Sequence, residues 1–275
     1  MRLTVLVDNN TTRRNLKAEA GLSIYIEDQA TKVLFDTGES ALFMENADKL
    51  GINLGEANYI VLSHGHYDHS WGLKYLLNLY NNTAGEPIAK SVLLTHPGAF
   101  NRRVENDVEL GCDIKEADLE EFFTIHKSSE PVWISERLVF LGEINRKFTF
   151  EGSHAIGQIV ENDIAEADFM ADDTAIVYKA RQGLVIITGC SHSGICNIVE
   201  QAKRICDDER VLAIIGGLHL KNKYQEQLRG TLKYLKQAEV QTLYACHCTD
   251  QASRIALAEL GNLCEVMVGL TLEFS

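Results

Sequence analysis

Three imidazoles and a carboxylate occur together in the segment SHGHYDHS, residues 63–70. His64 and His66 are two residues apart, and Asp68 and His69 follow after Tyr67. Because side chains two apart in an extended segment point the same way, His64 and His66 can bind one ion while Asp68 and His69 reach a second. Neutral imidazole with carboxylate is a ligand set that suits zinc, and also iron or manganese. The segment therefore predicts a metal site.

Five of the nine histidines come directly after an apolar, strand-like run. A single histidine in this position is more often an ordinary hydrogen-bonded residue, but five of them favour a shared role. Ligands bind in open α/β sheets at the carboxyl ends of the strands. We therefore expect these side chains to meet at one edge: His64, His96, His192, His219 and His247.

The apolar runs alternate with segments of helical period, which is typical of a layered α/β fold. The early runs 3–7, 22–27 and 32–35 predict strands of a meander. Later, strands are expected at 58–63, 174–178, 183–189, 211–217 and 240–246, and helices at 72–80, 195–205, 228–235 and 255–260. We predict one domain, 1–275, with a cap or insertion within 81–166, the least regular region.

Composition limits the classes of function. The 275 residues are 45% hydrophobic and 24% charged, which is typical of a globular chain long enough to bury a large core. A formal net charge of −13 argues against nucleic acid as a partner. No apolar run approaches the ~20 residues of a membrane helix, and the first residues lack the apolar core of a signal peptide. We expect a cytoplasmic protein.

The seven cysteines are an odd number, scattered in the way expected for thiols in a reducing compartment. Cys246 and Cys248 are separated by one residue, which is not the usual spacing of a zinc knuckle. We interpret these two as small buried residues.

The motif His64-x-His66-x-Asp68-His69 after an apolar strand, with later strand-end histidines, resembles the metallo-β-lactamase superfamily. That resemblance implies a four-layer α/β/β/α sandwich over most of the chain, with two metal ions at the shared edge of its sheets. Further phrases are similar to the branch labelled dihydropteroate-synthase-like: FDTG at 35–38, LLTHPGAF at 93–100, LGEINR at 141–146, ADDTA at 171–175, TGCSHSG at 188–194, GGLHL at 216–220 and CHCTD at 246–250.

The resemblance also implies a ligand set. His64 and His66 would bind metal one, Asp68 and His69 metal two, with Asp36 behind them as support. His192 is the expected third ligand of metal one, and either His219 or His247 completes metal two. Cys190 stands where many members have a bridging aspartate, so it is a ligand or lies close to one. Asp172 and Asp173 are further carboxylates, equally typical of an exposed turn.

The first functional hypothesis is a metal-dependent hydrolase with two divalent ions, zinc foremost, that cleaves an ester, phosphoester or lactone in a small molecule. The ions would activate a water molecule, Asp68 would orient it and receive its proton, and His219 or His247 would protonate the leaving group. His96 would bind substrate.

Two alternatives remain. The branch includes an archaeal enzyme proposed to join a dihydropterin methyl pyrophosphate to an aminobenzene ribofuranosyl phosphate, and a transferase of this kind would need cations for phosphate. Arg102, Arg103 and Arg146 are the candidates, although Arg102 and Arg103 equally suit a solvated surface. A di-iron redox or sensing protein is the other alternative, but its oxygen-reducing relatives have glutamate where this chain has His66. Relatives often pair, so a homodimer is possible.

Overall fold

The computed structural model describes residues 1–82, 90–162, 164–221 and 224–275. Contacts between Cα atoms divide the chain into two compact units. Unit 1 comprises Met1–Ser128, Gly157–Asp168 and Met267–Phe274, and unit 2 comprises Ser129–Ile156, Phe169–Val266 and Ser275. Organisation as one domain stays a prediction.

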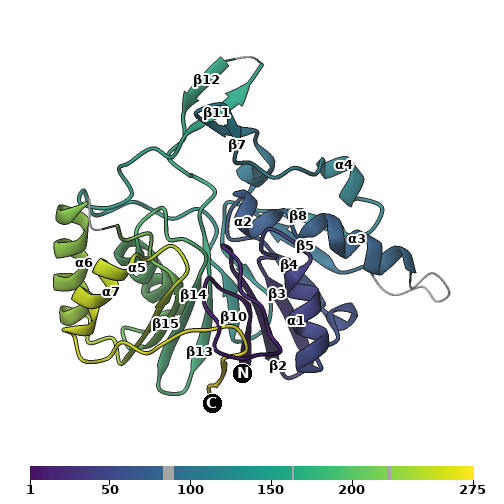
Figure 1. Cartoon of the computed structure of the whole chain (residues 1–275). Coiled ribbons are helices and arrows are strands. Elements are labelled where there is room, and N and C mark those ends of the chain that lie inside the picture. The colour runs from purple at the N-terminus through teal and green to yellow at the C-terminus, as the bar shows by residue number, and fades with distance from the viewer. Residues whose placement is uncertain (83–89, 163, 222–223) are drawn as a thin grey trace. The chain divides into compact units, whose positions relative to one another are not determined.

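Unit 1 is built on a seven-stranded sheet in the order β17-β1-β2-β3-β4-β5-β8 (Figure 1). Neighbours from β17 to β3 pair antiparallel, which confirms the predicted meander, and neighbours from β3 to β8 pair parallel. Phe35 is in register with Val61, and Val61 with Leu94, so the three parallel strands end side by side. The bounds are β1 Arg2–Val7, β2 Ser23–Asp28, β3 Thr31–Phe35, β4 Tyr59–Val61, β5 Val92–Thr95, β8 Thr124–Lys127 and β17 Thr271–Glu273.

Helices cover this sheet through one apolar core. Phe43 of α1 and Leu73 and Leu76 of α3 are fully buried, and they belong to a cluster that includes Leu34 and Ile60 of the sheet. The predicted helix 72–80 is confirmed as α3, and the strand expected at 58–63 is shorter, as β4. The helices of the unit are α1 Leu42–Leu50, α2 Tyr67–Ser70, α3 Leu73–Asn82 and α4 Glu116–Leu119, with single 3-10 turns η1 Leu54–Glu56 and η2 Pro97–Phe100.

A second, four-stranded sheet of unit 1 has the order β12-β11-β6-β7. Its strands are β6 Arg103–Glu105, β7 Val108–Glu109, β11 Gln158–Glu161 and β12 Ile164–Ala167, and all its pairs are antiparallel. These strands fall in the region where a cap was expected, 81–166, of which 83–89 and 163 lie outside the described residues. The same region also supplies strands to both large sheets, and a cap or insertion within it stays a prediction.

Unit 2 contains a six-stranded sheet in the order β16-β15-β14-β13-β10-β9. The three strands β14, β15 and β16 run parallel, and the others pair antiparallel. Three helices pack on it, and Ile198, Leu228 and Leu257, one from each helix, share a buried core with sheet residues such as Ile186 and Ile214. The bounds are β9 Val132–Trp133, β10 Leu138–Phe140, β13 Ala175–Ala180, β14 Gly183–Thr188, β15 Val211–Gly217, β16 Thr242–Cys246, α5 Ile195–Cys206, α6 Gln225–Gln237 and α7 Gln251–Ala258.

The predicted elements of unit 2 are confirmed with small shifts in their bounds. The largest shift is in the last helix, which begins at Gln251 rather than near Ile255. Asp250 explains the early start, since its carboxylate accepts a hydrogen bond of 2.7 Å from the backbone N–H of Ser253 and so caps the first turn. Each unit therefore supplies one large sheet and one set of helices, which are the kinds of layer that the expected sandwich requires.

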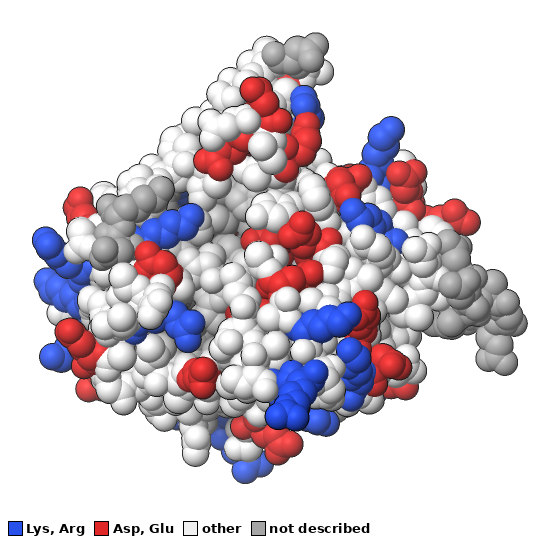
Figure 2. Space-filling model, viewed as in Figure 1, with Lys and Arg blue, Asp and Glu red and all other residues white. Residues whose placement is uncertain are grey.

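Acidic and basic side chains are both present on the surface of the protein. On the face shown in Figure 2, Lys and Arg are interspersed with Asp and Glu. Within the described ranges, we find no helix with the length and apolar character needed to cross a membrane.

A buried carboxyl group caps helix α5 from outside the helix. Glu151 is 2% exposed, and its carboxylate accepts hydrogen bonds from the backbone N–H groups of Asn197 (2.7 Å) and Cys196 (3.2 Å). These N–H groups belong to the first turn, where no partner exists within the helix. Burial raises the pKa of Glu151 from 4.5 to about 7, against the lowering effect of these hydrogen bonds.

The free energy of unfolding should therefore fall as the pH rises from about 4.5 to about 7. In this range the unfolded chain has released the Glu151 proton while the folded chain still holds it, which corresponds to roughly 3 kcal/mol over the whole interval. Urea unfolding at pH 5 and pH 8, with a chelator present, measures the effect. Glu151→Gln should remove this part of the pH dependence, and an unchanged dependence in the variant would contradict the assignment.

Candidate metal centre

The five strand-end histidines lie at the carboxyl edges of the two large sheets. In unit 1, His64 follows β4 and His96 follows β5, and these strands are parallel neighbours. In unit 2, His192, His219 and His247 follow β14, β15 and β16, which are also parallel neighbours. Within each sheet, the structure confirms the expectation that these histidines share an edge.

The segment Ser63–Ser70, here called the histidine loop, brings its imidazoles together in a buried place. His64 and His69 are fully buried, and His66 is 6% exposed. His64 Nε2 lies 3.2 Å from His66 Nδ1, so these two histidines present nitrogen atoms to one point, as their spacing predicts. His66 has an extended backbone and precedes α2, whose first turn carries Asp68 and His69. His69 Nε2 lies 3.8 Å from Asp68 Oδ1.

Asp36 holds the histidine loop from behind. Its Oδ2 accepts hydrogen bonds of 2.7 Å from His69 Nδ1 and from Ser63 Oγ, and its Oδ1 accepts one of 2.7 Å from the Ser63 backbone N–H. Ser63 Oγ also lies 2.9 Å from His64 Nδ1. The Nδ1 atoms of His64 and His69 thus face the supporting groups, and their Nε2 atoms face the other donors of the loop.

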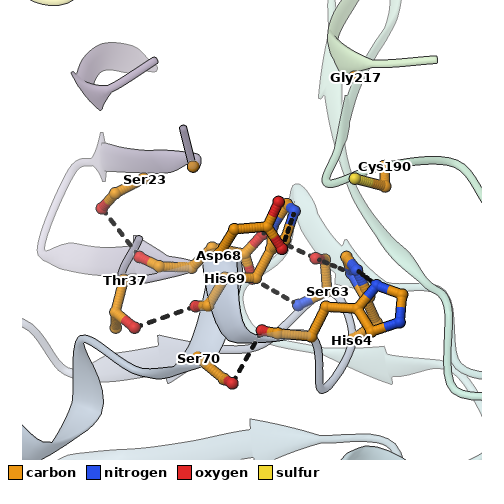
Figure 3. A network of polar contacts seen from close by, with 12 residues as sticks. Ser23, Thr37, Ser63, His64, Asp68, His69, Ser70, Cys190 and Gly217 are labelled. Carbon is orange, nitrogen blue, oxygen red and sulfur yellow. Dashed lines mark hydrogen bonds and ion pairs between the residues drawn. The ribbon is translucent and has the colours of Figure 1, made fainter. Parts of the chain in front are cut away.

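Hydroxyl groups fix the backbone around these side chains (Figure 3). Thr37 Oγ1 donates to the carbonyl oxygen of His69 (3.0 Å), and Ser70 Oγ donates to that of His66 (2.8 Å). Ser23 Oγ donates to the carbonyl oxygen of Asp36 (2.8 Å), whose φ of +57° is rare for a residue other than glycine. The loop conformation is therefore set by its neighbours as well as by its own sequence.

Gly65 allows a close approach to the segment after β5. A Cβ atom at this position would lie 1.9 Å from the carbonyl oxygen of Ala99 and 2.5 Å from Arg103 Nη1. Any larger residue would displace the histidine loop or the turn η2. Glycine is therefore needed at this position because the backbone of η2 lies directly against it.

In unit 2, the residues that follow the parallel strands adopt left-handed backbone conformations. Ser191, His219 and His247 have φ values of +57°, +44° and +50°. Such conformations are costly for residues with side chains and cluster at functional sites. Ser191 Oγ donates to the carbonyl oxygen of Gly217 (2.8 Å) and lies 2.9 Å from Thr188 Oγ1, which ties the loop after β14 to the end of β15.

These loops gather the donor side chains of unit 2. The rings of His192 and His219 have centroids 4.4 Å apart. The ligand atoms of Cys190, His247 and Cys248 all lie within 4.8 Å of one another. We refer to these five residues as the unit 2 cluster.

Asp173 positions the segment that carries His192. The carboxylate is fully buried, and its Oδ2 accepts hydrogen bonds from the backbone N–H (2.9 Å) and the hydroxyl (2.5 Å) of Ser193. Burial raises the pKa of Asp173 to about 6. Asp172 and Asp173 are both buried, so the interpretation of this pair as exposed turn acids is wrong.

The three arginines predicted as phosphate-binding groups all contact protein groups. Arg102 is exposed and donates to Glu109 Oε1 (3.0 Å). Arg103 is 1% exposed and forms an ion pair of 2.7 Å with Asp168, so placing it on a solvated surface is wrong. Arg146 donates to the carbonyl oxygens of Gly152 (2.6 Å) and Met170 (3.1 Å) and also contacts that of Phe169. Substrate binding by these arginines stays a prediction.

His96, predicted to bind substrate, is 8% exposed and helps to build its own turn. Its Nδ1 accepts a hydrogen bond of 3.1 Å from the backbone N–H of Gly98, which caps η2. Contact of His96 with substrate also stays a prediction.

The chemistry of the donors in the histidine loop fits a divalent metal ion. Three buried imidazoles and a carboxylate converge, and the second nitrogen of His69 is bonded to a carboxylate, the usual support of a metal-binding histidine. The unit 2 cluster contains imidazoles and two thiols, which also suit zinc.

The roles of three residues near these donors, Ser63, Asp168 and Cys248, were not predicted. Ser63 directly precedes the motif, and its small polar side chain was a signal that could have been used. Asp168 supports the loop through Arg103, and Cys248 lies beside Cys190. The two residues of each pair are 65 and 58 positions apart in the chain.

Comparisons with known proteins agree with the motif. The model of the metallo-β-lactamase superfamily matches residues 16–163. The 7,8-dihydropterin-6-methyl-4-(β-D-ribofuranosyl)-aminobenzene-5'-phosphate synthase of Methanocaldococcus jannaschii is 31% identical over 251 residues, which cover 84% of this chain and 81% of the synthase. A second, uncharacterised protein of that organism is 29% identical over 274 residues, or 97% of this chain and 98% of its own.

Among solved structures, the chain is similar to Tm1679, described as a metal-dependent hydrolase of the β-lactamase superfamily. The TM-score is 0.84 at 28% identity, covering 100% of this chain and 99% of that one. The similarity to the synthase and to this hydrolase confirms the fold expected from the sequence. The chain belongs to the metallo-β-lactamase superfamily.

Proposed function

We propose that this protein is a metal-dependent hydrolase that binds two divalent ions, with zinc as the first candidate, and cleaves an ester, phosphoester or lactone in a small molecule. The observation that carries the proposal is the convergence of buried imidazole nitrogens in the histidine loop, backed by the Asp36 carboxylate. Such a set of uncharged rings has little structural use, because each would need its own buried hydrogen-bond partner.

In the histidine loop the proposed ligands are His64, His66, Asp68 and His69. In the unit 2 cluster they are Cys190, His192 and either His219 or His247. When bound, the ions polarise a substrate oxygen and lower the pKa of a water molecule toward neutrality.

The side chains supply the remaining steps. Asp68 is partly exposed at the edge of its loop, so its carboxylate can orient the attacking water and accept the proton. Whichever of His219 and His247 does not bind metal would give a proton from its ring to the leaving group, since imidazole titrates near neutral pH.

The transferase is the second candidate function, and the 31% identity with the dihydropterin-linked synthase favours it. In that reaction the arylamine nitrogen would form a bond to the pterin methylene carbon, pyrophosphate would leave with the electrons of the broken C–O bond, and the amine would lose a proton. Bound divalent ions would supply positive charge for the leaving group. The two reactions differ in one requirement: a transferase forms product only when the arylamine is present, whereas a hydrolase needs water alone. Incubating the protein with the pterin pyrophosphate, with and without the aminobenzene ribofuranosyl phosphate, separates them by the product formed. Turnover independent of the arylamine would exclude the transferase.

Replacing His64 or His66 by Ala should remove bound metal and abolish turnover, because each deletes a ligand from a buried site. We expect the metal content to fall by at least one ion per chain and kcat/KM to fall more than about 100-fold, larger than the usual effect of removing a supporting group. Elemental analysis and a chromogenic phosphodiester assay measure the two effects. His126→Ala is the matched control, since His126 is exposed in β8. Retention of all metal in both variants would overturn the ligand assignment.

Asp36→Ala should weaken metal binding without deleting a ligand. The change removes the acceptor for His69 Nδ1 and for Ser63, so we expect an affinity about 10–100-fold lower in competition with a chelator. Asp28→Ala is a suitable control, because Asp28 is also a buried carboxylate but lies at the other end of β2 from Ser23. Equal effects of the two changes on metal affinity would count against a specific role for Asp36.

A further inference from the structure

The structure places the thiol of Cys248 among residues already expected to bind metal. The sulfur atoms of Cys190 and Cys248 and a ring nitrogen of His247 lie within 4.8 Å of one another, and all three residues belong to unit 2. Ligands of a tetrahedral zinc ion at about 2.3 Å would be separated by roughly 4 Å, so only small side-chain rotations are needed. We propose that Cys248 is a metal ligand, and that Cys190, His247 and Cys248 form a thiolate-containing site in the unit 2 cluster.

Cys246 and Cys248 have different surroundings in spite of their close spacing. Cys246 ends strand β16 and is 1% exposed in the sheet, in agreement with its interpretation as a small buried residue. His247 then takes a φ of +50°, which ends the alternation of the strand, and Cys248 is half-buried beside the strand-end loops. The interpretation of Cys248 as a core residue is therefore wrong.

Backbone groups hold the Cys248 sulfur in place. The backbone N–H of His219 donates to it at 3.3 Å, and the Cys248 thiol donates to the carbonyl oxygen of Cys190 at 3.6 Å. Metal binding requires the thiolate, so the S–H···O contact with Cys190 would be given up when the ion binds. Each thiol that becomes a ligand releases its proton to solvent.

Gly217, labelled with Cys190 in Figure 3, leaves room for this arrangement. A Cβ atom on Gly217 would lie 2.5 Å from Cys248 Sγ and 3.3 Å from His247 Cδ2. The last residue of β15 thus has no side chain where two of the three proposed ligands, His247 and Cys248, lie against the strand.

The charges and ligand types are consistent with the proposal. Cys190 and Cys248 as thiolates would offset the two positive charges of the ion. Thiolate ligands favour zinc and other soft ions over magnesium or manganese. With His247 bound to metal, His219 is the histidine that remains to transfer a proton, which deepens the proposed function and rests on it.

Titration of the metal-free protein with Cd²⁺, followed by ultraviolet absorption, tests the site. Thiolate ligation produces a charge-transfer band, and we expect this band to fall by about half in Cys248→Ser and in Cys190→Ser, because each removes one of two thiolates. Cys264→Ser, a half-buried thiol elsewhere in unit 2, should retain the full band. A full band in Cys248→Ser would overturn the proposal.

A second measurement uses the unaltered chain, in case a variant fails to fold. Bound Cd²⁺ should slow alkylation of Cys190 and Cys248 at least tenfold and leave Cys264 unaffected, as measured by mass spectrometry. Elemental analysis of the same samples separates this proposal from the proposed function. Two bound ions without a band or protection would overturn the thiolate site alone, and the absence of any bound ion would overturn both.

Discussion

The hydrogen bonds made by the Asp36 carboxylate are the contacts on which the histidine loop depends. One carboxylate fixes the ring of His69 and both polar groups of Ser63, and Ser63 in turn contacts the ring of His64. Asp36 can do this because β3 and β4 are parallel and in register, which places the residue after Phe35 beside the end of β4. The left-handed backbone conformation of Asp36 is strained, and these hydrogen bonds hold the residue in it.

A second level of support comes from the segment after β5. Arg103 pairs with Asp168, its guanidinium donates to the carbonyl oxygen of Gly98 (3.1 Å), and it lies against Gly65. The pair is buried, so loss of one partner would leave an uncompensated charge, at a cost of about 3–5 kcal/mol. The small sheet of unit 1 is thereby linked to the backbone of the histidine loop.

Much of the fold and part of the site could be predicted from the sequence. The spacing of His64 and His66 is a local property, and a strand end can be recognised from the apolar run before it. The positions of Cys248 and Arg103 depend instead on packing between distant segments: one sulfur reaches Cys190 across 58 residues, and the guanidinium reaches Asp168 across 65. Neither contact has a local pattern, so the sequence suggested a core thiol and a phosphate-binding cation.

The metal content of the protein, purified without added metal, tests the central claim most directly. Elemental analysis should find two divalent ions per chain, zinc foremost, because the histidine loop and the unit 2 cluster both present converging ligand atoms. Two irons would favour redox chemistry over hydrolysis. A protein that carries no ion, and takes up none when zinc is supplied, would contradict the account.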